Sequence, residues 1–112
     1  MNIEITPEVL VKQLGMGDSK HEIEQMQKVI ENTEGFDKFA SHIISLNDFL
    51  KHLKGYIALS NSVDKLKIKC DENDSKEILQ EFHDKIAAWS HKYKVKVEKV
   101  YNKETYYILG HK

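Results

Sequence analysis

The residues with the most distinctive chemistry lie near the C-terminus, where lysines flank tyrosines. Residues 92–107 read KYKVKVEKVYNKETYY. Lysines can hold a phosphate backbone while aromatic rings stack on bases, so this segment is a candidate nucleic-acid contact. Glu98 interrupts the basic run, and the solvated face of an ordinary sheet would look similar. The candidate contact residues are Lys94, Lys96, Lys99, Lys103 and Tyr106.

The histidines give no sign of a metal centre. They are His21, His42, His52, His83, His91 and His111, and none forms an H-x-x-x-H or H-E-x-x-H pattern. The single cysteine, Cys70, has no second cysteine to share a metal ion. We therefore predict no metal site and no cofactor.

No residue pattern indicates a nucleophile or a nucleotide-binding loop. Cys70 falls on the apolar side of an alternating segment, which favours a small core residue over a reactive thiol. The chain contains no G-x-S-x-G, no G-x-x-x-x-G-K-[ST] and no G-x-G-x-x-G. Gly15-Met16-Gly17 lies between two expected helices, where it indicates a helix stop and a turn. We predict no catalytic and no cofactor-binding residue.

The composition indicates which cellular compartment and which classes of ligand to expect. A chain of 112 residues with one cysteine can bury a core without disulfides, which suits a reducing compartment. The first residues do not read as a secretory signal, and no apolar run approaches the roughly 18 residues of a membrane span, so we expect a cytoplasmic protein with no membrane partner. All seventeen basic residues are lysine. The missing arginine disfavours specific base or nucleotide recognition, and it also fits the bacterial-like composition of an AT-rich genome.

We expect the segment 36–54, FDKFASHIISLNDFLKHLK, to form the helix against which the other elements pack. Its apolar residues cover roughly 220° of a helical wheel, about twice the stripe of an ordinary surface helix. Only a narrow strip is polar: Asp37, Ser41, Ser45, Asp48 and His52. A helix of this kind needs neighbours on two sides. We predict that it is central, with helices on one flank and a sheet on the other, and that Phe39, Ile43, Leu46 and Leu50 are nearly fully buried.

The remaining patterns predict the other elements. Thr6-Pro7 and the spacings Ser19/Glu22 and Asp74/Glu77 indicate helix starts, and Gly17-Asp18-Ser19 and Ser60-Asn61-Ser62 indicate turns. After Gly55 the hydrophobic period changes from 3.6 to 2, which predicts strands. The expected helices span about 6–15, 20–32, 36–54 and 75–92, and the expected strands span about 56–60, 65–71, 94–101 and 105–110.

These elements predict one α+β domain over residues 1–112. An N-terminal segment of three helices, with the central apolar helix third, is followed by a β-β-α-β-β mostly antiparallel sheet. Strand order and partners do not follow from the pattern.

Three functions remain open. The absence of a catalytic grouping favours a non-enzymatic protein-interaction or regulatory module. Its partner would be another protein or a second copy in a homodimer, reached through the central helix or through Tyr106–Leu109 as an open sheet edge. The second possibility is a nucleic-acid-binding protein that uses the Lys/Tyr-rich hairpin. The third is a small enzyme with an unrecognised cleft, with His83 or His91 beside a buried carboxylate.

Overall fold

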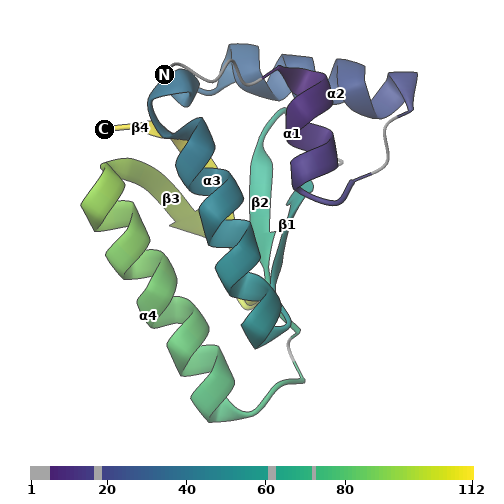
Figure 1. Cartoon of the computed structure of the whole chain (residues 1–112). Coiled ribbons are helices and arrows are strands. Elements are labelled where there is room, and N and C mark those ends of the chain that lie inside the picture. Colours follow the sequence, from purple (N-terminus) through teal and green to yellow (C-terminus); the bar gives the residue numbers. More distant parts are fainter. Residues whose placement is uncertain (1–5, 17–18, 61–62, 72) are drawn as a thin grey trace.

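The computed structural model describes residues 6–16, 19–60, 63–71 and 73–112, and it confirms the predicted α+β class. In chain order the elements are α1 (Pro7–Gln13), α2 (Lys20–Asn32), α3 (Phe36–Leu50), the short 3-10 helix η1 (Lys51–Leu53), β1 (Tyr56–Leu59), β2 (Leu66–Lys69), α4 (Lys76–Tyr93), β3 (Val95–Lys99) and β4 (Thr105–His111). Figure 1 shows α3 and α4 side by side on one face of the sheet, with α1 beside α3 and α2 across one end of the molecule. None of the helices so described is long and apolar enough to cross a membrane.

Helix α3 is the central helix that its composition predicts. Phe39, Ile43 and Leu50 are fully buried, and Leu46 is 1% exposed. The buried face is narrower than the sequence suggests, because Ile44 is only partly buried and Phe49 is 36% exposed. The five residues predicted to form its polar strip are all exposed. Packing against α4, β1 and β4 therefore accounts for most of its apolar surface.

Local capping fixes where the helices begin. The side chain of Thr6 accepts a hydrogen bond from the Val9 backbone N–H, and Ser19 accepts one from Glu22 N–H, as the spacing predicts. The predicted cap of the last helix, Asp74, is wrong by one residue. Ser75 accepts the hydrogen bond from Ile78 N–H instead. The predicted turns at Gly17-Asp18 and Asn61-Ser62 lie outside the described residues.

The sheet has the order β1-β2-β4-β3, and every neighbouring pair is antiparallel. Strand β4 therefore lies inside the sheet, so the expectation that Tyr106–Leu109 forms an open edge is wrong. The edges are β1 and β3. The predicted strand over 94–101 is also too long, because Lys94 is the left-handed cap of α4 and Val100 begins the turn to β4.

The buried residue Asn47 protects the edge strand β1. Its side-chain oxygen accepts a hydrogen bond of 3.0 Å from the Ile57 backbone N–H. Ser60 N–H donates to Lys65 O within the β1–β2 pair, so the alternating N–H of Ile57 points away from β2. The Asn47 side chain, which belongs to α3, thus occupies a backbone N–H with which an added strand would otherwise pair.

The two faces of the sheet differ in their surroundings. The inner face carries Ile57, Leu66, Ile68, Val95 and Ile108, all of which are buried against α3 and α4. The opposite side, which we call the outer face, has no helix packed across it in the part of the chain that the structure describes (Figure 1). Helix α2 reaches only the end of the sheet, where Gln25 Nε2 donates to Ser60 O at 2.7 Å.

Candidate functional site

The five residues predicted to contact nucleic acid do not share one surface. Lys96 lies on the outer face of β3, while Lys99 pairs with Tyr106 on the inner face. Lys94 caps α4, and Lys103 lies in the turn between β3 and β4. The Tyr106 hydroxyl is turned toward α4, where it contacts His83. The structure thus brings Lys96 to the outer face, whereas Lys94, Lys99 and Tyr106 lie elsewhere and Lys103 lies in the turn at one end of the sheet.

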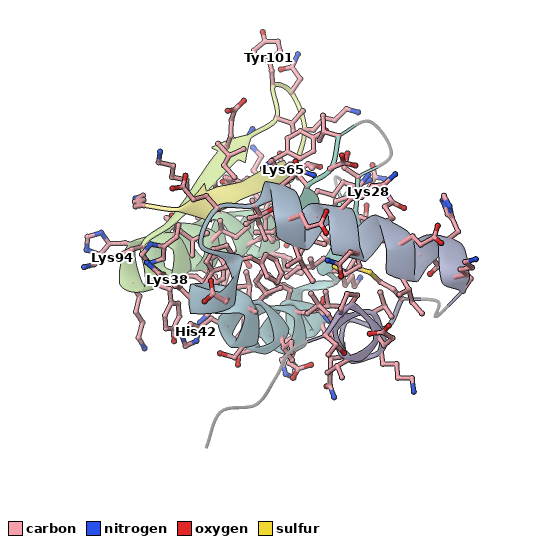
Figure 2. All side chains as sticks on the ribbon, turned by 90° about the horizontal axis from the view of Figure 1, so that it is seen from above. Lys28, Lys38, His42, Lys65, Lys94 and Tyr101 are labelled. Atoms are coloured by element: carbon pink, nitrogen blue, oxygen red, sulfur yellow. The ribbon has the colours of Figure 1, made fainter. Side chains whose placement is uncertain are left out.

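A different set of lysines gathers on the outer face. Leu66 and Ile68 of β2 are buried on the inner face, so the alternating Lys67 and Lys69 point the other way. The Lys65 ammonium donates to Leu109 O at 3.5 Å and also to Asn32 O, which holds it at the same end of β2 as α2. Figure 2 shows Lys65 near the outer side of the sheet, away from Lys38 and His42 on the helical side. The strict alternation of this strand already indicated two faces, but only the fold shows that one of them is uncovered.

Cross-strand neighbours complete the outer face. The register places Ala58, Lys67, Tyr107 and Glu98 in one row across the sheet and Tyr56, Lys69 and Thr105 in the next. Tyr56 is 48% exposed beside Lys69. Glu98 is the single acid among these seven residues. With Lys65 and Lys96, these outer-face residues include four lysines and one acid, and the exposed Tyr56 ring lies next to Lys69.

An open hollow of about 630 Å³ continues the outer face at its far end, where β2 finishes and β4 begins. Three lysines reach it from different segments: Lys54 after η1, Lys69 on β2, and Lys103 in the β3–β4 turn. Asp71 is the acid among the described residues that line it. The described lining residues are Lys54, Tyr56, Lys69, Cys70, Asp71, Asn73, Lys103 and Thr105.

Cys70 is one of the residues that line this hollow and is 5% exposed, in agreement with its predicted place in the core. Its Sγ lies 3.6 Å from both Leu53 O and Asp74 Oδ2. Burial, followed by the hydrogen bond and charge of Asp74, raises the pKa of the Cys70 thiol to about 11. The thiol therefore stays protonated near neutral pH and is a poor nucleophile.

A second polar group joins α4 to the start of β4. His83 Nε2 contacts the Glu104 carboxylate, and His83 Nδ1 lies 2.6 Å from the Tyr106 hydroxyl. With a neutral His83 ring, Nε2–H donates a hydrogen bond to Glu104 and Nδ1 accepts one from the Tyr106 hydroxyl. Burial raises the pKa of Tyr106, and the nearby Glu104 charge raises it further.

This Glu104–His83–Tyr106 chain supplies half of the arrangement expected for an enzyme, namely a histidine beside a carboxylate. His83 and Glu104 have side chains 24% and 25% exposed. A protonated phenol at neutral pH is not a ready nucleophile, and the three residues tie the hairpin to α4. Sequence reasoning missed this group because nothing local to His83 shows that it faces β4 across a gap of twenty-one residues.

The comparisons with known proteins give no further guide. No family model matches the chain, and neither a curated protein nor a solved structure matches it. The residues themselves must therefore carry any functional argument. Among the described residues, no three His, Cys, Asp or Glu side chains are grouped as a metal ion would need.

Proposed function

We propose that this protein is a small binding protein that holds single-stranded nucleic acid on the outer face of its sheet. The observation that carries the proposal is the pair Lys67 and Lys69 on the outer face of the internal strand β2, with Tyr56 beside Lys69 and with Lys65 just before the strand. Alternate residues of a strand are about 6–7 Å apart, so Lys65, Lys67 and Lys69 leave the backbone in a line along the same side, with the Lys65 ammonium held by the Asn32 and Leu109 carbonyls at one end. A track of cations suits a repeating chain of phosphates better than it suits a single small anion.

The residue types favour a sequence-tolerant contact. Lysine binds phosphate as a point charge, while the bidentate reading of guanine is chiefly the work of arginine, which this chain lacks. A tyrosine ring can stack on any base because every base has a π face. An unpaired strand exposes both its phosphates and its bases to such a surface, so the proposed ligand is single-stranded.

A salt titration with labelled oligonucleotides tests the proposal. The parent protein should bind an unstructured oligonucleotide at low salt and weaken steeply as salt rises. In Lys67→Gln/Lys69→Gln, two phosphate contacts are lost, so the slope of log K against log[salt] should become shallower by about 1.4. The affinity at low salt should also fall by tenfold or more.

A matched control separates this contact from general attraction. Lys12→Gln/Lys38→Gln removes the same charge from α1 and α3, whose residues at these positions are exposed on the helical side. It should keep the parent slope. Absence of binding at low salt, or equal losses in the two double variants, would contradict the proposal.

The other two possibilities stay predictions. The large apolar side chains exposed among the described residues are Val9, Phe49, Tyr56, Val63 and Tyr101, which lie on separate segments. Scattered apolar residues of this kind do not single out a protein interface. Sedimentation at several concentrations tests the homodimer, because a self-associating chain gains mass as its concentration rises.

A further inference from the structure

We infer that the hollow lined by Lys54, Lys69 and Lys103 binds a phosphate monoester, and that in a nucleic-acid complex this group is the terminal phosphate of the strand. The second clause rests on the proposed function, whereas the first stands on the hollow alone. At about 630 Å³ the hollow has the size of an ordinary small-ligand site. Its polar lining, however, suits a hydrated anion.

Charge is the first argument for a phosphate. Among the described residues, three lysines and one aspartate line the hollow, so these side chains contribute more positive than negative charge to it. Lys54 Nζ also lies 3.8 Å from Asp74 Oδ1, but the Asp74 side chain is only 6% exposed. Asp74 therefore pairs with the Lys54 ammonium itself and offsets part of its charge, while the carboxylate contributes little surface to a ligand and the Lys54 side chain stays 72% exposed. Lysines from three segments converging on one polar hollow are a recurrent way to bind phosphate.

Position is the second argument. Lys69 belongs both to the hollow and to the lysine row of β2, and its cross-strand neighbour Tyr56 lines the hollow as well. A strand that follows Lys65, Lys67 and Lys69 therefore ends in the hollow. The turn carrying Lys103 lies on the β4 side of that end.

Ionisation distinguishes a terminal phosphate from the internal ones. A phosphate monoester carries about −1.5 to −2 charge at pH 7, while an internal diester carries −1. A hollow with three lysines gains more from the additional charge than the row of single lysines on β2 does. The hollow should therefore prefer the phosphorylated end of an oligonucleotide to its interior.

The test compares oligonucleotides of one sequence with a 5′-phosphate, a 3′-phosphate or two hydroxyl ends. The parent protein should bind one of the phosphorylated forms roughly three- to tenfold more tightly than the hydroxyl form. Lys103→Gln should remove this preference while leaving binding of the hydroxyl form, because Lys67 and Lys69 are intact. The matched variant Lys38→Gln, which loses the same charge from α3, should keep the preference.

A second arm uses ligands without a strand. Inorganic phosphate and a phosphorylated sugar should raise the melting temperature of the parent, and Lys103→Gln should abolish the rise. If they do so while all oligonucleotides bind equally or not at all, the hollow is a site for free phosphate compounds and the strand-end assignment is wrong. If neither phosphorylated ends nor free phosphate has an effect, the phosphate site itself is wrong. Lys54→Gln serves as a second variant and should reproduce the effect of Lys103→Gln.

Discussion

The side-chain oxygen of Asn47 accepts a hydrogen bond of 3.0 Å from the backbone N–H of Ile57, and both residues are at most 2% exposed. The contact joins the central helix to an edge strand. It satisfies a backbone donor that would otherwise be buried without a partner. Asn47 is the buried polar side chain of α3, and it pairs with this backbone donor of the edge strand.

Replacing this acceptor should destabilise the fold. Asn47→Ala leaves the Ile57 N–H buried and unpaired, which should lower the free energy of unfolding by about 1–3 kcal/mol in a denaturant titration. The neighbouring Asp48→Ala removes an exposed carboxylate whose ion pair with Lys51 spans 3.5 Å, and it should cost at most about 1 kcal/mol. Equal costs in the two variants would argue against a capping role for Asn47.

The central position of α3 makes a second prediction about stability. Leu46 is 1% exposed, so Leu46→Ala should cost about 2–5 kcal/mol through lost burial and the cavity left behind. Phe49, on the same helix, is 36% exposed and covered on one side by Lys85 at 4.3 Å from its ring. Phe49→Ala should therefore cost clearly less than Leu46→Ala in the same thermal melt. The reverse order would show that the core has been assigned to the wrong side of the helix.

Much of the fold follows from patterns that are local in the sequence. The apolar period of residues 36–54 predicts a central helix, and the alternation Leu66, Ile68, Cys70 predicts a two-faced strand; both predictions are confirmed. The side-chain caps at Thr6 and Ser19 are also local, since each lies three residues from its donor. These features are determined by interactions between residues that are close in the sequence.

The candidate site depends on pairings that no local pattern contains. Alternation places Lys67 and Lys69 on one side of β2, but only the arrangement of α3 and α4 on the other face leaves that side uncovered. Strand order likewise places β4 inside the sheet, which turns Tyr106 toward His83. The residues predicted to contact nucleic acid, Lys94, Lys96, Lys99, Lys103 and Tyr106, are distributed by the fold over several surfaces.

Alkaline pH should destabilise the fold through ionisation of the buried Cys70 thiol. The pKa of Cys70 is raised from its usual 9.0 to about 11, so the folded state binds the proton more tightly than the unfolded chain does. The corresponding stability is present below pH 9 and is lost as the pH rises through 11, with an upper limit of about 2–3 kcal/mol. Urea titrations between pH 8 and pH 11 should show a steeper loss for the parent than for Cys70→Ala. Parallel curves would mean that the thiol is not held protonated by the fold.

Removal of the acid on the outer face, Glu98, should increase the affinity for oligonucleotides. Glu98 pairs with Tyr107 in the row that contains Lys67, so its charge repels a strand bound along β2. Glu98→Gln should therefore tighten oligonucleotide binding about two- to fivefold at low salt, and the gain should shrink as salt is added. A useful control is Glu24→Gln on α2, where the exposed carboxylate lies on a different element. Equal gains in both variants would mean that the effect comes from the net charge of the protein and not from the position of Glu98.

The most direct test of the proposed binding surface is an NMR titration of the ¹⁵N-labelled protein with an unstructured oligonucleotide. Amide shifts should concentrate at Tyr56, Lys67, Lys69 and Tyr107, with the exposed turns of α3 and α4 unchanged. Shifts confined to the helical side, or a spectrum that does not respond at low salt, would contradict the claim that the outer face binds nucleic acid.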